Sequence, residues 1–262
     1  MRQPRHSHCE DGTVQLSGRV LIVTGASRGI GRATVHALVA RGATVVASAR
    51  DAAALAPLPA TTVVADVRDP AHASMLVQAA LDRHGRLDGV VANAGVGYEG
   101  AFASMSSERI DEILDVNLRA PIALAHAALP HLRSDSSSEG GVVVFVSSIA
   151  GALPVPLEGV YSTSKAAIEA FAETLREQVR DDGVQVGTVL PGAVRTEFFE
   201  RRGAPYVRKF PRPIAPEAVA DAVIRVIEDG RDRVIVPRWL ALPVRLRGVA
   251  PGTYRALARR FG

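Results

Sequence analysis

Short apolar runs alternate along this chain with longer stretches in which apolar residues recur at helical spacing. The apolar runs predict strands at residues 19–24, 43–48, 61–65, 87–92, 141–147, 184–190 and 233–236. The helical spacing predicts helices at residues 30–41, 70–84, 106–133, 160–181 and 215–229. Strands that alternate with helices indicate parallel pairing, and uninterrupted apolar runs indicate strands covered on both faces. The pattern therefore predicts an α/β fold with one doubly wound parallel sheet of about seven strands and helices on both faces.

The two ends of the chain fall outside this alternation. Residues 1–18 are polar and predict a flexible N-terminal tail. Residues 238–262 combine Arg with apolar side chains, and Pro243 and Pro251 predict that this segment is broken into short pieces. We expect a single domain over residues 19–262, with this basic, apolar segment at its C-terminal end.

Cysteine use and hydropathy bear on where the protein works. Cys9 is the only cysteine, so no internal disulfide forms and a reducing compartment is indicated. Cys9 and the histidines beside it at 6–9 are possible metal ligands, but no second ligand cluster accompanies them, so we predict no metal site. No secretory signal follows Met1, and no apolar run reaches the roughly 18 residues of a spanning helix. We therefore expect a cytoplasmic protein.

Positive charge is concentrated late in the chain. The formal net charge is +4. Residues 231–262 carry eight Arg and one Asp, a net of +7, and residues 200–212 carry five basic side chains and one Glu, a net of +4. The remainder is therefore net negative, and the overall balance does not indicate a nucleic-acid partner.

Tyr161 and Lys165 form the most informative pair in the sequence. The chain has 31 basic residues, of which only Lys165 and Lys209 are lysines. Residues four apart on a helix share a face, so the ammonium can lie beside the phenol. A positive charge there favours the phenolate and lowers a pKa that is about 10 in water, which suits the Tyr to acid–base work. The alternative is an ordinary surface pair on an amphipathic helix.

A glycine-rich turn joins the first predicted strand to the first predicted helix. It reads Gly25-Ala26-Ser27-Arg28-Gly29-Ile30-Gly31. Glycines in this context let the backbone approach a phosphate, which then rests on the helix N-terminus. The same residues also spell the nucleophile elbow of serine hydrolases, which requires an acid and then a His later in the chain. The last histidine is His131, so we reject the hydrolase interpretation.

Five motifs now stand in one order: the glycine turn, Asn93-Ala94-Gly95, Asn117, Ser148 and Tyr161-x-x-x-Lys165. This order resembles the short-chain dehydrogenase/reductase family over about residues 17–237. The resemblance implies a Rossmann-type, dinucleotide-binding catalytic domain. It also implies an oxidoreductase that passes a hydride between a nicotinamide and a carbonyl or secondary alcohol carbon.

The resemblance implies four catalytic roles. Tyr161 would be the general acid in reduction and the base in oxidation, and Lys165 would lower its pKa and bind the nicotinamide ribose. Ser148 would hydrogen-bond the substrate oxygen, and its spacing of thirteen residues before Tyr161 selects it over Ser147. Asn117 would hold a water that links Lys165 to solvent.

The resemblance also implies the cofactor site. Asp66 and Val67 would contact the adenine, and the segment after the sixth strand would hold the carboxamide end. Ala92 stands where the family usually has a first Asn before Asn93. The implied cofactor-binding residues are Gly25, Ser27, Arg28, Gly29, Ile30, Gly31, Arg50, Asp66, Val67, Asn93, Ala94, Gly95, Tyr161, Lys165, Pro191, Gly192, Val194 and Thr196.

The end of the second strand bears on which dinucleotide binds. An acidic residue there selects NAD by binding the ribose 2′-hydroxyl, but that position is Ala49, and Arg50 follows it. Arg28 and Arg50 would flank a 2′-phosphate with two guanidinium groups, although Asp51 lies beside them. We therefore expect NADP(H) rather than NAD(H), with reduction as the working direction.

The basic, apolar segment 238–262 and the proline-rich segment 191–214 lie where this family closes its substrate pocket. They favour a hydrophobic or acyl-type substrate. The C-terminal segment could contact a membrane peripherally, bind an anionic acyl carrier, or pack on the domain or a partner subunit. The resemblance implies a homodimer or homotetramer. A competing function is a non-catalytic, cofactor-sensing regulator on the same fold, which would typically lack the Tyr or the Lys.

Overall fold

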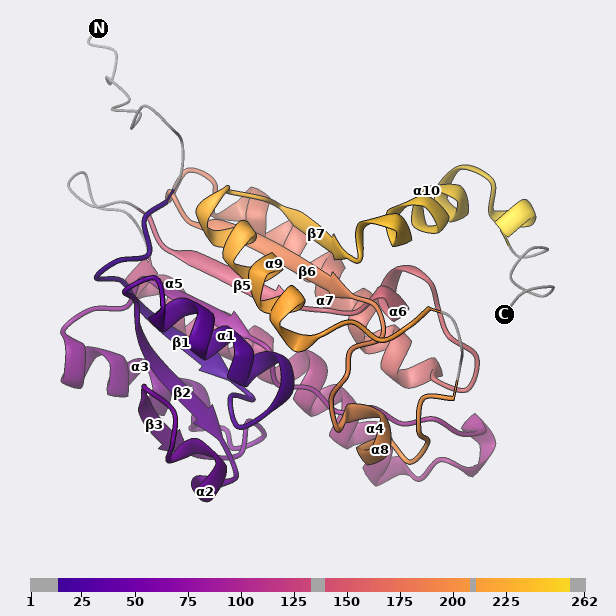
Figure 1. The fold of residues 1–262 in the computed structure, drawn as a ribbon, viewed down its shortest axis with the longest axis horizontal. Helices are drawn as coiled ribbons and strands as arrows, with labels where there is room; N and C mark the ends of the chain where they lie inside the picture. The colour runs from indigo at the N-terminus through magenta and orange to yellow at the C-terminus, as the bar shows by residue number, and fades with distance from the viewer. Residues whose placement is uncertain (1–13, 133–139, 208–210, 255–262) are drawn as a thin grey trace, which may run out of the picture.

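The computed structural model describes residues 14–132, 140–207 and 211–254. Its centre is a parallel sheet of seven strands in the order β3-β2-β1-β4-β5-β6-β7 (Figure 1), which confirms the predicted fold. Every predicted strand is present within two or three residues of its expected ends. The strands are β1 (Val20–Thr24), β2 (Thr44–Ala49), β3 (Thr61–Val64), β4 (Gly89–Ala92), β5 (Val142–Val146), β6 (Gln185–Pro191) and β7 (Arg233–Val236).

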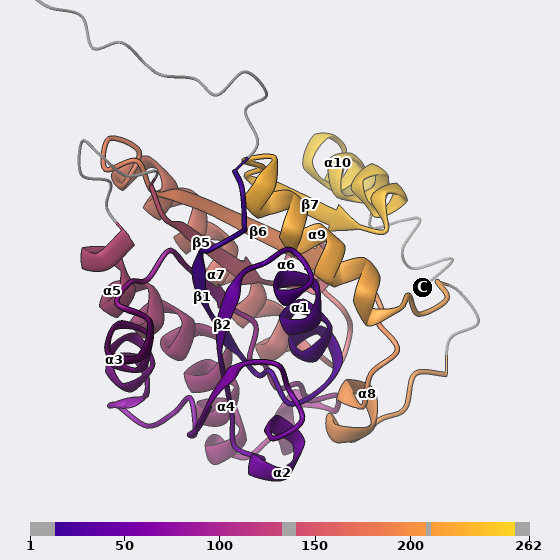
Figure 2. The ribbon, with the colours of Figure 1, turned by 60° about the vertical axis from the view of Figure 1, so that its left-hand side comes forward.

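Helices cover both faces of the sheet (Figures 1 and 2). Alternate residues of β1 point into opposite layers: Leu21 and Val23 pack with α1 and α9, and Val20 and Ile22 pack with α3, α5 and α7. This two-sided burial explains why the strands are uninterrupted apolar runs. The main helices are α1 (Gly29–Val39), α3 (His72–His84), α4 (Ser107–Leu114), α5 (Ala120–Leu132), α7 (Gly159–Gln178), α9 (Pro216–Glu228) and α10 (Ala241–Val249).

Three short helices and a π turn were not predicted. The helix expected at 106–133 is α4 and α5 separated by a π-helical turn, Asp115–Arg119. The short helices are α2 (Ala52–Leu55), α6 (Ile149–Ala152) and α8 (Phe198–Arg201). Each is a single turn that follows a strand end, too short to show a period in the sequence.

The predicted break at Pro243 is wrong, because α10 runs through it. Pro243 lies in the first turn of α10, where a backbone N–H has no intrahelical partner to lose. The helix does end before Pro251, as expected. A 3-10 turn, Arg238–Leu240, joins β7 to α10.

The described residues at the N-terminal end, 14–18, pack on the domain. Leu16 is buried, and the Val14 N–H donates to the Glu228 carbonyl oxygen at 2.9 Å. The predicted flexible tail therefore does not extend over residues 14–18, because an apolar side chain in this segment reaches the layer that holds α1 and α9. The possible metal ligands at 6–9 lie outside the described residues.

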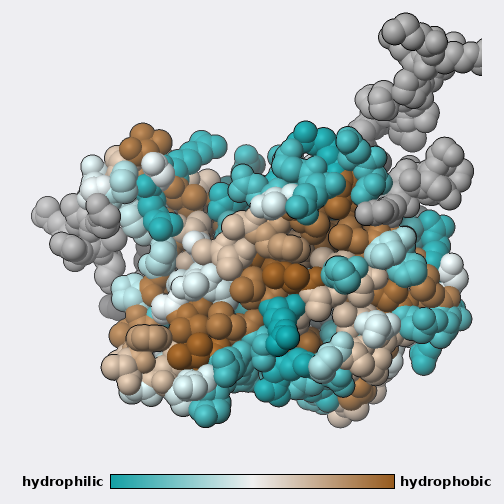
Figure 3. Space-filling view, turned by 180° about the vertical axis from the view of Figure 1, so that it is seen from behind, coloured by the Kyte–Doolittle hydropathy of each residue, from teal (hydrophilic) through white to brown (hydrophobic). Residues whose placement is uncertain are grey.

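The surface behind the sheet carries apolar side chains. Figure 3 shows apolar patches between bands of hydrophilic side chains on this face. Within the described part of the chain, no helix is long and apolar enough to cross a membrane. The same residues contain no cluster of His, Cys, Asp and Glu that could hold a metal ion.

Candidate active site

A cleft of about 710 Å³ lies at the carboxyl ends of the central strands. Ligands of doubly wound sheets bind at this edge, beside the point where the strand order reverses between β1 and β4. Almost every residue predicted for the site lines the cleft. The two exceptions, Gly31 and Asn117, contact residues that line its wall.

The glycine turn leaves no room for side chains. A Cβ added to Gly31 would lie 2.2 Å from the Gly25 carbonyl oxygen, and one added to Gly29 would lie 2.8 Å from Cγ2 of Thr196. Gly25 and Gly29 also have positive φ angles of +65° and +51°, which favour glycine. The turn thus presents bare backbone and the N-terminus of α1 to the cleft, which suits a diphosphate.

Asn93 holds this turn in place from the next strand. Its Nδ2 donates to the carbonyl oxygens of Thr24 and Gly25, at 2.9 and 3.3 Å. The Thr24 hydroxyl accepts from the backbone N–H groups of Asn93 and Ala94. Asn93 therefore fixes the shape of the cradle.

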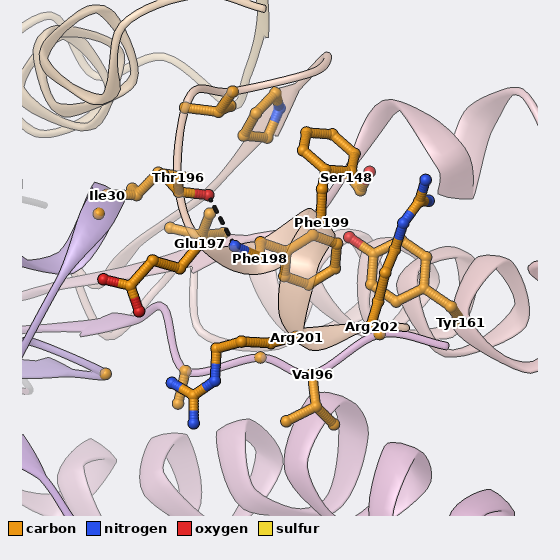
Figure 4. Close-up of a pocket in the computed structure, with 18 of the residues that line it drawn as sticks. Ile30, Val96, Ser148, Tyr161, Thr196, Glu197, Phe198, Phe199, Arg201 and Arg202 are labelled. Carbon is orange, nitrogen blue, oxygen red and sulfur yellow. Dashed lines mark hydrogen bonds between the residues drawn. The ribbon is translucent and has the colours of Figure 1, made fainter. Parts of the chain in front are cut away.

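Tyr161 and Lys165 come from the first two turns of α7 and are both buried. The Lys165 ammonium donates to the Val146 carbonyl oxygen at 3.0 Å and lies 6.0 Å from the centre of the Tyr161 ring. The Ser148 side chain lies close enough to the Tyr161 phenol to lower its pKa. Figure 4 shows Ser148 and Tyr161 in the same cavity.

Burial shifts the pKa values of this pair in opposite directions. It raises the pKa of the Tyr161 phenol to about 12, although the nearby Ser148 hydroxyl opposes the shift. It lowers the pKa of the Lys165 ammonium to about 8, against the attraction of Glu169. The predicted fall of the Tyr161 pKa is not met, because desolvation of the phenolate is the largest cause of its shift.

The two neighbouring serines have different partners. The Ser147 hydroxyl donates to the Lys165 carbonyl oxygen at 3.0 Å and to Glu169 at 3.2 Å, so it ties β5 to α7. Ser148 caps α6 by accepting from the Ala150 N–H, and it also reaches Tyr161. Of the two serines, Ser148 is therefore the one whose hydroxyl lies beside the Tyr161 phenol.

Asn117 sits in the π turn, almost fully buried. Its Oδ1 accepts from the Val96 N–H and its Nδ2 donates to the Val96 carbonyl oxygen, both at 2.9 Å. Nδ2 also donates to the Ser164 hydroxyl at 3.1 Å. A Cβ added to Gly95 would lie 3.4 Å from Asn117 Oδ1 and 3.6 Å from Lys165 Nζ, so the three residues meet behind the cleft.

The predicted arginines lie at the far end of the cleft. Arg28 pairs with Glu197 at 2.5 Å and with Asp51 at 3.2 Å, while Asp51 also caps α2. Arg50 is half exposed and lies 3.8 Å from Asp66. A hydrogen bond from Arg68 is the main reason that the pKa of Asp66 falls to about 2.

The loop after β6, part of the segment 191–214 that we expected to close the substrate pocket, forms one wall of the cleft. Phe198 packs on the Tyr161 ring with centroids 5.5 Å apart, and Arg202 stacks over Phe199 (Figure 4). Buried Arg202 pairs with Glu158, at the start of α7, and with Glu99 at 2.5 Å. Arg202 was not singled out from the sequence because Arg is abundant there. Only its burial in the structure distinguishes Arg202 from its exposed neighbours.

A second cavity of about 370 Å³ adjoins the cleft, and Tyr161, Val155 and Pro156 line both. Its other walls are mainly apolar or aromatic. Leu157, the one non-glycine residue with a positive φ (65°) in the described chain, accepts a hydrogen bond from the Gly100 N–H at 3.0 Å. That bond joins the two loops that form the cavity.

Fold and site together define a dinucleotide-binding α/β oxidoreductase. A family model described as short chain dehydrogenase matches residues 19–206. The chain therefore belongs to the short chain dehydrogenase family, as the sequence motifs indicated.

Individual relatives agree with this assignment. The ketoacyl reductase HetN of Nostoc sp. is 33% identical over 84% of this chain and 79% of its own. The versicolorin reductase stcU of Emericella nidulans is 37% identical over 71% of this chain and 72% of its own. A solved short chain dehydrogenase/reductase from Burkholderia phymatum, in complex with NAD, is 25% identical with a TM-score of 0.80, over 90% of this chain and 94% of that one.

Proposed function

We propose that this protein is an NADP(H)-dependent oxidoreductase that reduces a carbonyl group on a hydrophobic or acyl-type substrate. The observation that carries the proposal is the buried Tyr161 phenol at the wall of the cleft, with Ser148 beside it and the Lys165 ammonium behind it. Ser148, Tyr161, Lys165 and Asn117 are the proposed catalytic residues.

The residues of the cleft fit a dinucleotide. The glycine turn and the N-terminus of α1 would hold the diphosphate, and Asp66 and Val67 would border the adenine. Lys165 would bind the nicotinamide ribose, since an ammonium has three donors and the Val146 carbonyl takes one. Pro191, Gly192, Val194 and Thr196 would border the nicotinamide. The bound dinucleotide would supply the hydride.

The protein's own part in reduction is to hold and protonate the substrate oxygen. The Ser148 hydroxyl would hydrogen-bond that oxygen and stabilise the charge that develops there. Tyr161 would donate its proton to it, and a raised pKa keeps the phenol protonated at neutral pH. The Lys165 ammonium would stabilise the resulting phenolate. Asn117, bonded to Val96 and Ser164, would hold the wall beside Lys165 and support its link to solvent.

Charge at the adenine end supports NADP(H). Arg28 and Arg50 both line the cleft, and the position that would carry an acid for NAD is the buried Ala49. The acid that follows, Asp51, is already engaged by the N-terminus of α2 and by Arg28. The Burkholderia phymatum relative was solved with NAD, so the preference needs a direct test.

Replacing Arg50 with Ala is expected to weaken NADPH binding about 10- to 100-fold and NADH binding much less, because only NADPH carries the 2′-phosphate. Both affinities can be measured by fluorescence titration. Arg68→Ala is the matched control, since Arg68 also contacts Asp66 but does not line the cleft. Equal losses for the two dinucleotides in Arg50→Ala would refute the assignment of NADP(H).

The second cavity supports a substrate with a sizeable apolar part. It opens beside Tyr161 and is walled by side chains such as Phe102, Met105 and Leu157. Relatives named as a ketoacyl reductase and a versicolorin reductase also favour extended carbonyl substrates. We infer that the apolar part of the substrate enters this cavity while its carbonyl meets Tyr161 and Ser148.

Filling the cavity should separate long substrates from short ones. A Cβ added to Gly159 would meet no atom within 4 Å, so this residue can accept a side chain. Gly159→Phe is expected to raise KM about tenfold or more for long apolar ketones and to change it little for short ones. Gly159→Ala, the control, should leave both unchanged. A uniform loss of activity in Gly159→Phe would count against the cavity as a substrate site.

We also propose an oligomeric state and a location for this enzyme. We expect a homodimer or homotetramer that buries apolar side chains of the face shown in Figure 3, through the helices that hold Asn117 and Tyr161. We also expect a cytoplasmic enzyme without nucleic-acid or metal partners. The regulator interpretation would require binding of the dinucleotide without turnover.

A further inference from the structure

Helix α10 projects from the end of the sheet beyond β7 (Figures 1 and 2). None of its residues is buried, in contrast to the other long helices of the described chain. Buried Leu240 precedes it, and the Arg247 guanidinium donates to the Ala152 carbonyl oxygen. The helix is therefore attached to the body along one side only.

The opposite side of α10 is an exposed apolar stripe. Leu242, Leu246 and Val249 are spaced i, i+4 and i+7, so they share one face, and Leu240 and Arg247 lie on the other. Leu242 is 74% exposed and Val249 is 88% exposed, whereas Leu246 between them is partly buried. Large apolar side chains gathered on an exposed helix face mark an interaction surface.

The charge around this stripe has a single sign. Within the described residues 238–254, the charged side chains are Arg238, Arg245 and Arg247, with no Asp, Glu or Lys. On a helix, Arg238 and Arg245 fall beside the stripe. A second copy of this helix would bring like charges together, which disfavours a self-contact and favours an anionic partner.

We propose that α10 and its apolar stripe dock on an anionic lipid surface. An apolar face beside Arg side chains is the pattern of helices that lie in the membrane interface, where the apolar face is buried and the cations meet anionic headgroups. The helix follows directly after Leu240, which lines the cleft, and contacts α6 through Arg247. Docking would therefore bring the mouth of the active site close to the lipid surface that holds apolar substrates.

The test is flotation of the full-length protein with vesicles of phosphatidylglycerol and phosphatidylcholine, and with vesicles of phosphatidylcholine alone. Removing residues 238–262 would also remove Leu240, so point substitutions are cleaner. Leu242→Ser with Val249→Ser is expected to lower binding to anionic vesicles about tenfold or more, and Arg245→Gln about fivefold. Met75→Ser is the control, because Met75 is also an exposed apolar residue (43%) on α3, a different helix.

Binding of the wild-type protein to anionic vesicles, weakened by salt and by the α10 substitutions but not by Met75→Ser, would support the proposal. Absence of binding to anionic vesicles would overturn it and direct attention to an acidic protein partner. Equal binding by the α10 variant would also overturn it. If the wild-type protein forms a dimer that the α10 variant loses, and neither binds vesicles, the stripe is instead a contact between copies. None of these measurements depends on turnover or on the dinucleotide.

Discussion

Replacing Tyr161 with Phe is expected to lower kcat for carbonyl reduction about 10²- to 10⁴-fold, because the variant loses the proton donor at the substrate oxygen. The ring is kept, so its packing against Phe198 should persist. NADPH affinity should change little. Initial rates of NADPH oxidation and fluorescence titration of NADPH measure the two effects separately.

Tyr98→Phe is the matched control for this experiment. Tyr98 lines the second cavity, outside the proposed catalytic group, so its hydroxyl should be dispensable for turnover. Retained activity in Tyr161→Phe would exclude Tyr161 as the general acid. A loss of both activity and thermal stability would instead point to a structural role for the phenol.

Replacing Lys165 with Met is expected to lower kcat about 10²- to 10³-fold, because the phenolate left after proton transfer loses its stabilising charge. NADPH binding should weaken as well, since the proposed ribose donor is gone. Thermal stability at neutral pH should be unchanged or higher, because a buried ammonium is replaced by an apolar side chain of similar length. Lower stability together with lower activity would contradict this account.

The pH dependence gives an independent view of Lys165. With a pKa of about 8, the ammonium loses its proton as the pH rises through that value, whereas Tyr161, at about 12, stays protonated. The rate of reduction by the wild-type protein should therefore fall above about pH 8. In Lys165→Met this alkaline decline should be absent, and a decline that persists would assign it to another group.

The sheet was predictable because its strands are buried on both faces. Such strands carry an uninterrupted apolar run, as Val20 to Val23 do, and the run itself reports the burial. The placement of Tyr161 and Lys165 on one helix was predictable for a similar reason, since it depends on local helical spacing. The choice of Ser148 over Ser147 rests on the family resemblance and stays a prediction, although Ser148 is the serine that lies near Tyr161.

Features that depend on distant contacts were not predictable. The π turn at Asn117 reads as ordinary helix, and its position becomes evident only from the bonds to Val96 and Ser164. The Arg202–Glu158 pair joins residues 44 apart along the chain. The direction of the Tyr161 pKa shift depends on how deeply the phenol is buried, and the spacing of residues along the sequence does not give that depth.

The buried ion pair of Glu158 and Arg202 acts both on Tyr161 and on the wall of the substrate pocket. Glu158 raises the pKa of the phenol and Arg202 lowers it, so the two members of this buried pair act on Tyr161 in opposite directions. The ion pair between Glu158 and Arg202 also holds the loop after β6 against the start of α7 and keeps Phe198 on the Tyr161 ring. The pocket wall and the proposed acid are thus positioned by the same contacts.

The central claim is most directly tested by following NADPH and NADH oxidation with a panel of 3-ketoacyl thioesters and uncharged lipid ketones and aldehydes. The account predicts turnover of at least one apolar carbonyl class, faster with NADPH than with NADH and abolished by Tyr161→Phe. Binding of the dinucleotide without turnover of any carbonyl in the panel would contradict it and favour a cofactor-sensing regulator on the same fold.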